Sequence, residues 1–155
     1  MLFRSRQFLL LMRGDEVTVP VVITVRPDGK AFRMETKVPV MVPETRRLAA
    51  SQLVARLNAR TERGHYDLDL DNGEVDFRID CHAPGSVVDR RSFLVVLKMT
   101  LDPVLLDFRA LESVFHREAD PKAAIDALEA ARSAARDAAA RDAAARQRKV
   151  DIERE

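Results

Sequence analysis

The 155-residue chain has little of several residue types from which functional sites are commonly built. It has no tryptophan, only 5% of its residues are aromatic, and its one cysteine, Cys81, excludes an internal disulfide. The five glycines occur singly, so the chain has no glycine-rich phosphate-binding loop. A formal net charge of +1 provides no overall field to attract nucleic acid or an anionic membrane. We therefore do not expect nucleic acid or a membrane as partner.

Long apolar segments are absent as well. No stretch approaches the roughly 20 apolar residues that a membrane-spanning helix needs. The apolar run at residues 8–12 is too short for the core of a signal peptide, and no small-residue cleavage site follows it. Together with the lack of disulfides, this predicts a cytoplasmic protein.

The residues that are present are typical of one globular domain with a tail. The chain is 46% hydrophobic and 33% charged, which suffices for a core. We expect an α+β domain over residues 1–118 and an extension rich in Ala, Arg and Asp over residues 119–155. Asp120 and Pro121 would begin a helix there, and Ile125 and Leu128 could touch the domain. The repeat at residues 136–145 has nothing large to bury, which predicts a solvated, fraying helix or a disordered tail.

Three strands are predicted before the first helix, in a meander. Residues 2–12 form the first, and the continuous apolar run near its end would place it centrally in a sheet. Strict alternation predicts a half-buried strand over residues 17–25, with Pro20 on its outward face. A turn at residues 26–30 leads to a third strand over residues 32–40.

Two helices are predicted in the domain. Pro43 and Glu44 would begin the first, and Gly64 would end it. After a loop at residues 82–86, Asp89 can cap the second, in which Pro103 predicts a kink or a break into two helices. Their apolar stripes are Leu48, Leu53, Val54 and Leu57 in the first helix, and Leu94, Leu97, Leu101, Val104, Phe108, Leu111 and Phe115 in the second.

A β-hairpin is predicted around Asn72 and Gly73, which favour a two-residue type I′ turn. This turn would pair Asp71 with Glu74, Leu70 with Val75, Leu68 with Phe77, and Tyr66 with Ile79. Because side chains alternate along a strand, one face of the hairpin would be buried. That face comprises Tyr66, Leu68, Leu70, Val75, Phe77, Ile79 and Cys81.

The opposite face of the hairpin is charged, and it supplies candidate binding residues. In the predicted register Asp69 lies opposite Asp76, and like charges in that position destabilise a sheet unless solvent, a cation or a partner's arginine screens them. A solvated face is the simpler interpretation, and a docking face for a protein partner is the alternative. The candidate partner-binding residues are Arg46 and Arg47 of the first predicted helix together with Asp69, Asp76 and Arg78 of the hairpin.

Residue patterns for catalysis or metal binding are not found. A calcium loop would need Gly at its sixth position and a carboxylate at its twelfth, where this segment has Asn72 and Arg78. Cys81 and His82 are neighbours on a strand and point to opposite faces, which prevents a thiol–imidazole pair. His65 and His116 are isolated. We expect no enzyme activity, no cofactor and no metal.

Residues 38–115 combine a helix begun at Val42-Pro43-Glu44, Leu57-Asn58 near its end, Gly64, and the hairpin with Asp71-Asn72-Gly73-Glu74-Val75. In these residues the segment resembles the YbjN-like family of bacterial proteins, which are described as sensory-transduction regulators. The resemblance implies an antiparallel α+β fold in the order β-β-β-α-β-β-α, like that of type III secretion chaperones, although that fold begins with a helix and this chain begins with a predicted strand. The matching residues are Val42, Pro43, Glu44, Arg46, Leu53, Leu57, Asn58, Gly64, Tyr66, Asp69, Asp71, Gly73, Glu74, Val75, Phe77 and Arg78.

The function that the resemblance implies is a non-catalytic regulatory module that binds a protein partner, with a homodimer as one arrangement. A secretion or folding chaperone for a specific client is the first alternative. The second is a small-ligand-binding sensor or an enzyme, which would require a pocket of convergent polar groups.

Overall fold

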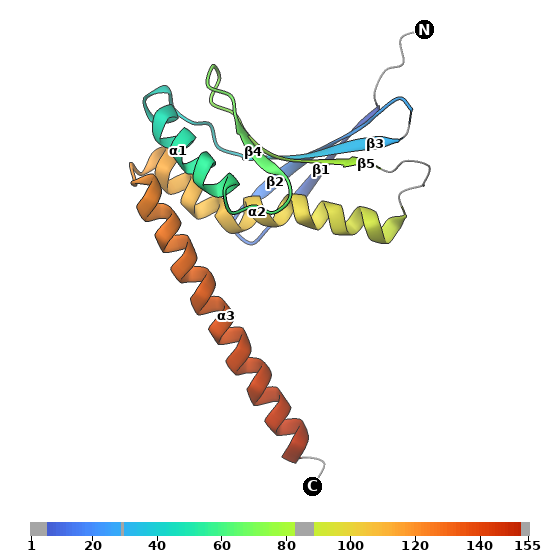
Figure 1. Cartoon of the computed structure of the whole chain (residues 1–155), viewed down its shortest axis with the longest axis vertical. Helices are drawn as coiled ribbons and strands as arrows, with labels where there is room; N and C mark the ends of the chain where they lie inside the picture. The colour runs from blue at the N-terminus through green and yellow to red at the C-terminus, as the bar shows by residue number, and fades with distance from the viewer. Residues whose placement is uncertain (1–5, 29, 83–88, 153–155) are drawn as a thin grey trace.

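The computed structural model describes residues 6–28, 30–82 and 89–152, and it has one antiparallel sheet with helices on one side (Figure 1). Residues 2–5 of the predicted first strand and 83–86 of the predicted loop lie outside this description. The order of the elements confirms the predicted α+β class. The elements are β1 (Arg6–Arg13), β2 (Thr18–Val25), β3 (Ala31–Lys37), a 3₁₀ turn η1 (Glu44–Arg46), α1 (Arg47–Asn58), β4 (His65–Leu68), β5 (Val75–His82), α2 (Arg90–His116) and α3 (Pro121–Ile152).

The strand order in the sheet is β1-β2-β3-β5-β4, so the first three strands form the predicted meander. The prediction of a central first strand is wrong, because β1 lies at an edge of the sheet and pairs with β2 alone. Helix α2 packs against β3 and β5, and β1 extends past this cover. Phe8, on the face of the helices, lies past this cover and is 53% exposed, whereas Leu9 and Leu11 point to the outer face of the sheet and are 65% and 70% exposed.

The core lies between the sheet and the helical layer. Alternate residues of β2, namely Val19, Val21 and Ile23, are buried as predicted. Helix α1 contributes Ala50, Leu53, Val54 and Leu57, while Leu48 is 75% exposed and not buried as expected. Leu48 precedes Ala50 by two positions, which at 3.6 residues per turn places it on nearly the opposite side of the helix.

Helix α1 ends at Asn58, six residues before the predicted stop at Gly64. Gly64 instead begins the approach to β4 with φ +79°. A Cβ there would lie 2.7 Å from the Arg78 carbonyl oxygen, so this glycine allows the chain to pass close to β5.

The hairpin forms, but its register differs from the prediction by two residues. Tyr66 lies opposite Phe77, Leu68 opposite Val75, and Asp67 opposite Asp76. The turn is longer than two residues: the Asp69 amide donates to the Glu74 carbonyl at 2.9 Å, and the Gly73 amide donates to the Asp69 carbonyl at 2.8 Å.

The physical reason for the longer turn is the set of contacts that hold its residues. The Asp69 carboxylate accepts from the amides of Asp71 and Asn72 at 2.8 and 3.3 Å. The Val42 amide donates to the Gly73 carbonyl, which ties the turn to the segment before η1. Because the shift is an even number of residues, the side chains that remain in β4 and β5 keep their predicted faces, whereas Asp69, Leu70 and Asp71 move from the predicted strand into the loop.

The two C-terminal helices follow β5. The Asp89 carboxylate accepts from the Ser92 amide at 2.8 Å, which confirms the predicted cap of α2. This helix continues through Pro103 and does not break in two; its predicted apolar stripe is buried or half-buried except at Leu94, which is 49% exposed.

Helix α3 begins at Pro121, and its residues Ile125 and Leu128 are buried against the domain as expected. Farther along, it projects away from the domain (Figure 1). The division of the chain at residue 118 stays a prediction. Within the part of the chain described, no helix has the length and apolar character to span a membrane.

Candidate functional site

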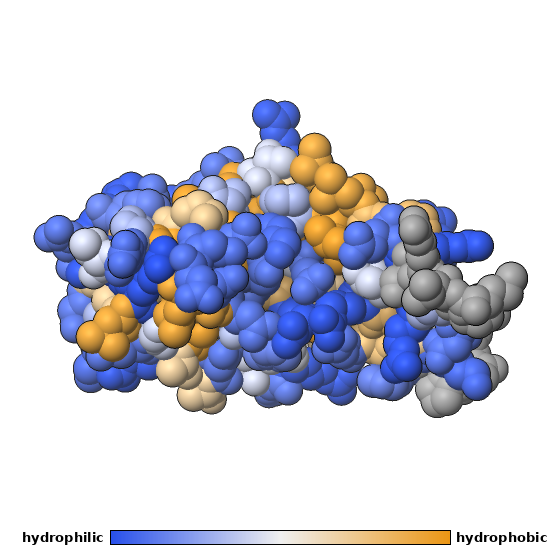
Figure 2. Space-filling view, turned by 90° about the horizontal axis from the view of Figure 1, so that it is seen from above, coloured by the Kyte–Doolittle hydropathy of each residue, from blue (hydrophilic) through white to orange (hydrophobic). Residues whose placement is uncertain are grey.

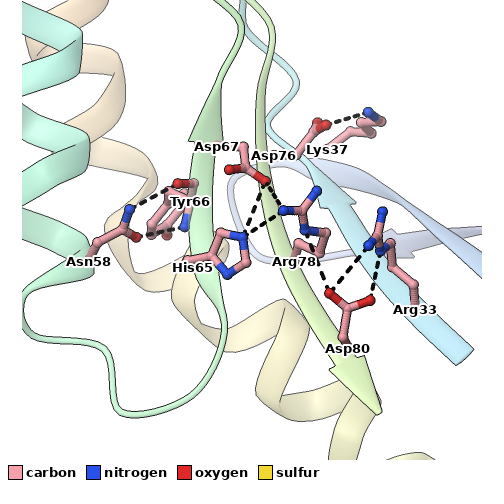
Figure 3. A network of polar contacts seen from close by, with 9 residues as sticks. All are labelled: Arg33, Lys37, Asn58, His65, Tyr66, Asp67, Asp76, Arg78 and Asp80. Carbon is pink, nitrogen blue, oxygen red and sulfur yellow. Dashed lines mark hydrogen bonds and ion pairs between the residues drawn. The ribbon is translucent and has the colours of Figure 1, made fainter. Parts of the chain in front are cut away.

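The outer face of the sheet, which the helices do not cover, has a charged half built from β3, β5 and β4 (Figure 3). Strand pairing sets the contacts: Arg33 lies directly opposite Asp80, and Lys37 lies opposite Asp76. The Arg33 Nε donates to the Asp80 carboxylate at 2.8 Å, and the Lys37 ammonium donates to Asp76 at 2.5 Å. The hydrogen bond from Arg33 lowers the pKa of the Asp80 carboxyl.

The charged half also contains a pair of like charges. Asp67 and Asp76 face each other across β4 and β5, where the sequence predicted Asp69 and Asp76. Arg78 lies 3.0 Å from the Asp67 carboxylate, and Lys37 holds Asp76. Arg78 and Lys37 therefore neutralise this pair from within the chain, and an arginine of a partner is not needed to screen it.

The two arginines proposed from the first helix lie elsewhere and bind backbone carbonyls. Arg46 donates from Nε to the Val114 carbonyl at 2.9 Å and from its guanidinium to the Ala119 carbonyl at 3.0 Å. These are carbonyls near the C-terminal end of α2, where a helix leaves acceptors unpaired. Arg47 donates to the Leu70 carbonyl at 2.6 Å and so joins the hairpin loop to α1.

The five predicted site residues thus do not form one cluster. Asp76 and Arg78 lie on the outer face of the sheet, whereas Arg46, Arg47 and Asp69 connect loops and helices. Each of the five has a hydrogen bond or ion pair within the described residues. Their role in binding a partner stays a prediction.

A buried polar cluster that sequence reasoning missed lies beneath the sheet. Asp107 of α2 is 4% exposed, accepts from the Tyr66 hydroxyl at 3.0 Å and pairs with Arg132 at 2.5 Å. Burial raises the pKa of Asp107 and also that of Tyr66, which is therefore a neutral donor. The signal in the sequence was a carboxylate at position 107, between Val104 and Leu111 of the apolar stripe.

A cavity of about 570 Å³ adjoins this cluster, between the end of α1, α2 and α3. Its apolar lining includes Leu57, Met99 and Leu106. Asp107 and Arg132 also line it, but they bind each other, and Asp107 also accepts from the Tyr66 hydroxyl. Among the described residues, no group of three or more His, Cys, Asp or Glu side chains is placed to hold a metal ion.

The outer face of the sheet has a second, apolar half along β1 and β2. We call it the apolar margin and define it by Leu9 and Leu11 of β1 with Pro20 and Val22 of β2. Leu9 lies opposite Val22, and Leu11 lies opposite Pro20. Figure 2, which looks onto the molecule from above, shows hydrophobic residues gathered beside a larger hydrophilic area.

The two edges of the sheet differ in how they are protected. At the β4 edge, the Asn58 side chain donates to the Tyr66 carbonyl at 2.9 Å and accepts from the Tyr66 amide at 2.7 Å. Asn58 thereby binds the backbone groups of Tyr66 that a neighbouring strand would bind, and α1 packs against β4. The β1 edge has no such cover in the described sheet.

Between the arginines at its two ends, strand β1 also lacks the features by which proteins usually protect an edge. Charged residues and prolines discourage pairing with another chain, but Gln7 through Met12 contain neither. The structure thus combines an unpaired backbone edge with exposed leucines on the same strand.

Comparisons with known proteins identify no family. No protein-family model matches the sequence, and no curated protein matches it. One chain in the crystal structure of the ExsC–ExsE complex is similar, with 22% identity over 62% of this chain and 68% of that chain, at a TM-score of 0.39. A TM-score below 0.5 is too low to establish a common fold, and the resemblance to the YbjN-like family stays a prediction.

Proposed function

We propose that this protein is a non-catalytic interaction module that binds a protein partner through the apolar margin and the β1 edge. The observation that carries the proposal is the exposure of Leu9 and Leu11 on a strand whose outer backbone edge is unpaired. A sheet edge of this kind accepts an added strand, with backbone hydrogen bonds supplying affinity and alternate side chains supplying specificity.

The distribution of charge supports the same surface. On the outer face the charged half is neutralised by pairs such as Arg33–Asp80 and Lys37–Asp76. Interfaces commonly have an apolar centre depleted of charge and a polar rim. The apolar margin beside this neutralised network has that composition, whereas the charged half does not.

The regulatory role comes from the resemblance to YbjN-like proteins, and we place the protein in the cytoplasm. A chaperone for a specific client is the second candidate, because an extended client segment could add to the β1 edge. The two roles differ in the partner: a regulator binds a folded protein, whereas a chaperone holds an unfolded segment.

The test compares proteins purified from the native cell by light scattering and mass spectrometry. The variant Leu9→Lys/Leu11→Lys places charge at two exposed positions of the margin. Leu48→Lys is the matched control, because Leu48 is equally exposed but lies on α1. We expect wild type and control to carry a stoichiometric protein partner, either another protein or a second copy of this chain, and the double variant to lose it. Retention of the partner by the double variant would exclude the apolar margin.

A further inference from the structure

We propose that the occupant of the β1 edge is a second copy of this chain, paired antiparallel with Leu10 opposite Leu10 of the second copy. The two five-stranded sheets would then form one sheet of ten strands. This inference rests on the proposed function, since it names the partner of the same surface.

Two copies of β1 are complementary to each other when they pair antiparallel. Its centre is five apolar residues and its two ends are arginines. With Leu10 on the two-fold axis, Leu9 faces Leu11 of the second copy, and Phe8 faces Met12 of the second copy. Every apolar residue of the strand therefore meets another apolar residue.

This register brings apolar side chains of the two copies together on both faces of the ten-stranded sheet. Residues directly opposite each other in an antiparallel pair point to the same side. Leu9 and Leu11 of both copies lie on the outer face, next to Pro20 and Val22. Phe8 lies on the face of the helices, where it is 53% exposed in one chain, and it would there be covered by Met12 of the second copy.

Repulsion between like charges disfavours the register that is shifted by one residue. Shifting the pairing by one residue puts Leu9 opposite Leu10 and also places Arg6 opposite Arg13 at both ends. Like charges directly opposite each other destabilise a sheet. In the proposed register Arg13 faces Gln7, and Arg6 faces Gly14, beyond which the second copy continues into Asp15 and Glu16.

The other edge of the sheet offers no equivalent surface. Strand β4 has four residues, and Asn58 already occupies the amide and carbonyl of Tyr66. Symmetric pairing through β4 would have to break these bonds and displace α1. Pairing through β1 requires no rearrangement of the described chain.

The first experiment measures the mass of the full-length protein by light scattering. We expect twice the 17.5 kDa of one chain for wild type and for Leu48→Lys. The Leu9→Lys/Leu11→Lys variant should have the mass of a single chain with an unchanged circular dichroism spectrum. A dimer that persists in this variant would overturn the proposal.

The second experiment tests the register by disulfide trapping in a Cys81→Ala background. Opposite residues have Cα atoms about 4.5–5.5 Å apart, which suits a disulfide. Leu10→Cys should therefore cross-link two chains under mild oxidation. Leu9→Cys is the matched control, because the two copies of position 9 are diagonal, about 7–8 Å apart, and should not cross-link. Cross-linking by Leu9→Cys but not by Leu10→Cys would overturn the register.

The outcomes separate this inference from the proposed function. A monomer that binds a different protein through the apolar margin would overturn the second copy as occupant and leave the interaction module intact. A monomer that binds no protein at this margin would overturn both.

Discussion

Asp107 shows how a single residue can join three elements. Its carboxylate receives the Tyr66 hydroxyl from β4 and the Arg132 guanidinium from α3, while its own backbone belongs to α2. A buried polar group without partners is costly, so these contacts favour one arrangement of the helices over the sheet. Burial raises the pKa of Asp107 above its ordinary value of 3.8 and outweighs Arg132 and Tyr66, which lower it.

This pKa shift predicts a pH dependence. The folded state keeps the Asp107 proton to a higher pH than the unfolded state does, so the contribution of Asp107 to the free energy of unfolding is largest below pH 3.8 and falls as the pH rises through the folded pKa. Asn at this position does not ionise. The free energy of unfolding of wild type minus that of Asp107→Asn should therefore fall with rising pH, as measured by urea denaturation at several pH values.

The control for this pH series is Asp102→Asn, which affects a half-exposed carboxylate paired with Lys98 on the same helix. Its difference from wild type should stay within about 0.5 kcal/mol throughout. A difference between wild type and Asp107→Asn that is constant with pH would contradict the shift.

Gly73 gives a second prediction at the residue scale. Its φ is +82°, and a Cβ would clash with the carbonyl oxygen of Val42. Replacement by the β-branched Val adds backbone strain to this clash, so Gly73→Val should lower the free energy of unfolding by at least about 2 kcal/mol in urea denaturation. Asp71→Val, at an exposed position of the same loop, should change it by less than about 0.5 kcal/mol. Equal stability of the two variants would show that the loop does not need this conformation.

At the scale of elements, the two ends of α3 have different roles. The first turns bury Ile125 and Leu128, and Arg60 of the segment after α1 pairs with Glu129 at 2.5 Å. Arg132 is at the end of this contact region, where it forms an ion pair with Asp107. Side chains from 135 to 144 are exposed, so that part of the helix contributes little to the core.

Two truncations that differ by one residue test this division. Deletion of residues 133–155 should leave the free energy of unfolding within about 0.5 kcal/mol of wild type. Deletion of residues 132–155 also removes the Arg132 partner of a buried carboxylate and should cost a further ~1–3 kcal/mol in urea denaturation. If both truncations have the same stability, the ion pair between Arg132 and Asp107 does not anchor α3.

On the scale of the whole molecule, the 26 basic and 25 acidic residues nearly cancel. The described ion pairs lie within the chain, and the apolar margin carries no charge. Association through this margin is therefore driven by burial of apolar surface rather than by opposite charges.

This charge balance predicts that the dimer is insensitive to salt. Screening shortens the range of charge interactions from about 10 Å at 0.1 M to about 3 Å at 1 M, but it does not weaken apolar contacts. The mass of the wild-type protein in light scattering should be the same at low and high sodium chloride. Dissociation at high salt would instead indicate an interface built on charge, such as the network around Arg78.

Much of the fold followed from local patterns in the sequence. Alternation placed Val19, Val21 and Phe77 on the buried face, because side-chain direction in a strand depends only on position along the chain. Asp89 was identified as a helix cap for the same reason, since its bond to the Ser92 amide is local. The faces of the residues that form β4 and β5 were right even though the register was not, because a shift of two residues preserves the face, but Asp69, Leu70 and Asp71 lie in the loop instead.

Only the tertiary structure decided which surfaces remain uncovered. The apolar run of β1 is compatible with a strand buried on both sides and with an exposed edge. The pairing of β1 with β2 alone, in a sheet with helices on one side only, determines which one occurs. For this reason the sequence suggested the charged residues Asp76 and Arg78 as the candidate site, whereas the structure suggests the apolar margin around Leu9 and Leu11. Local spacing specifies which way a side chain points, whereas exposure depends on contacts between segments far apart in the sequence.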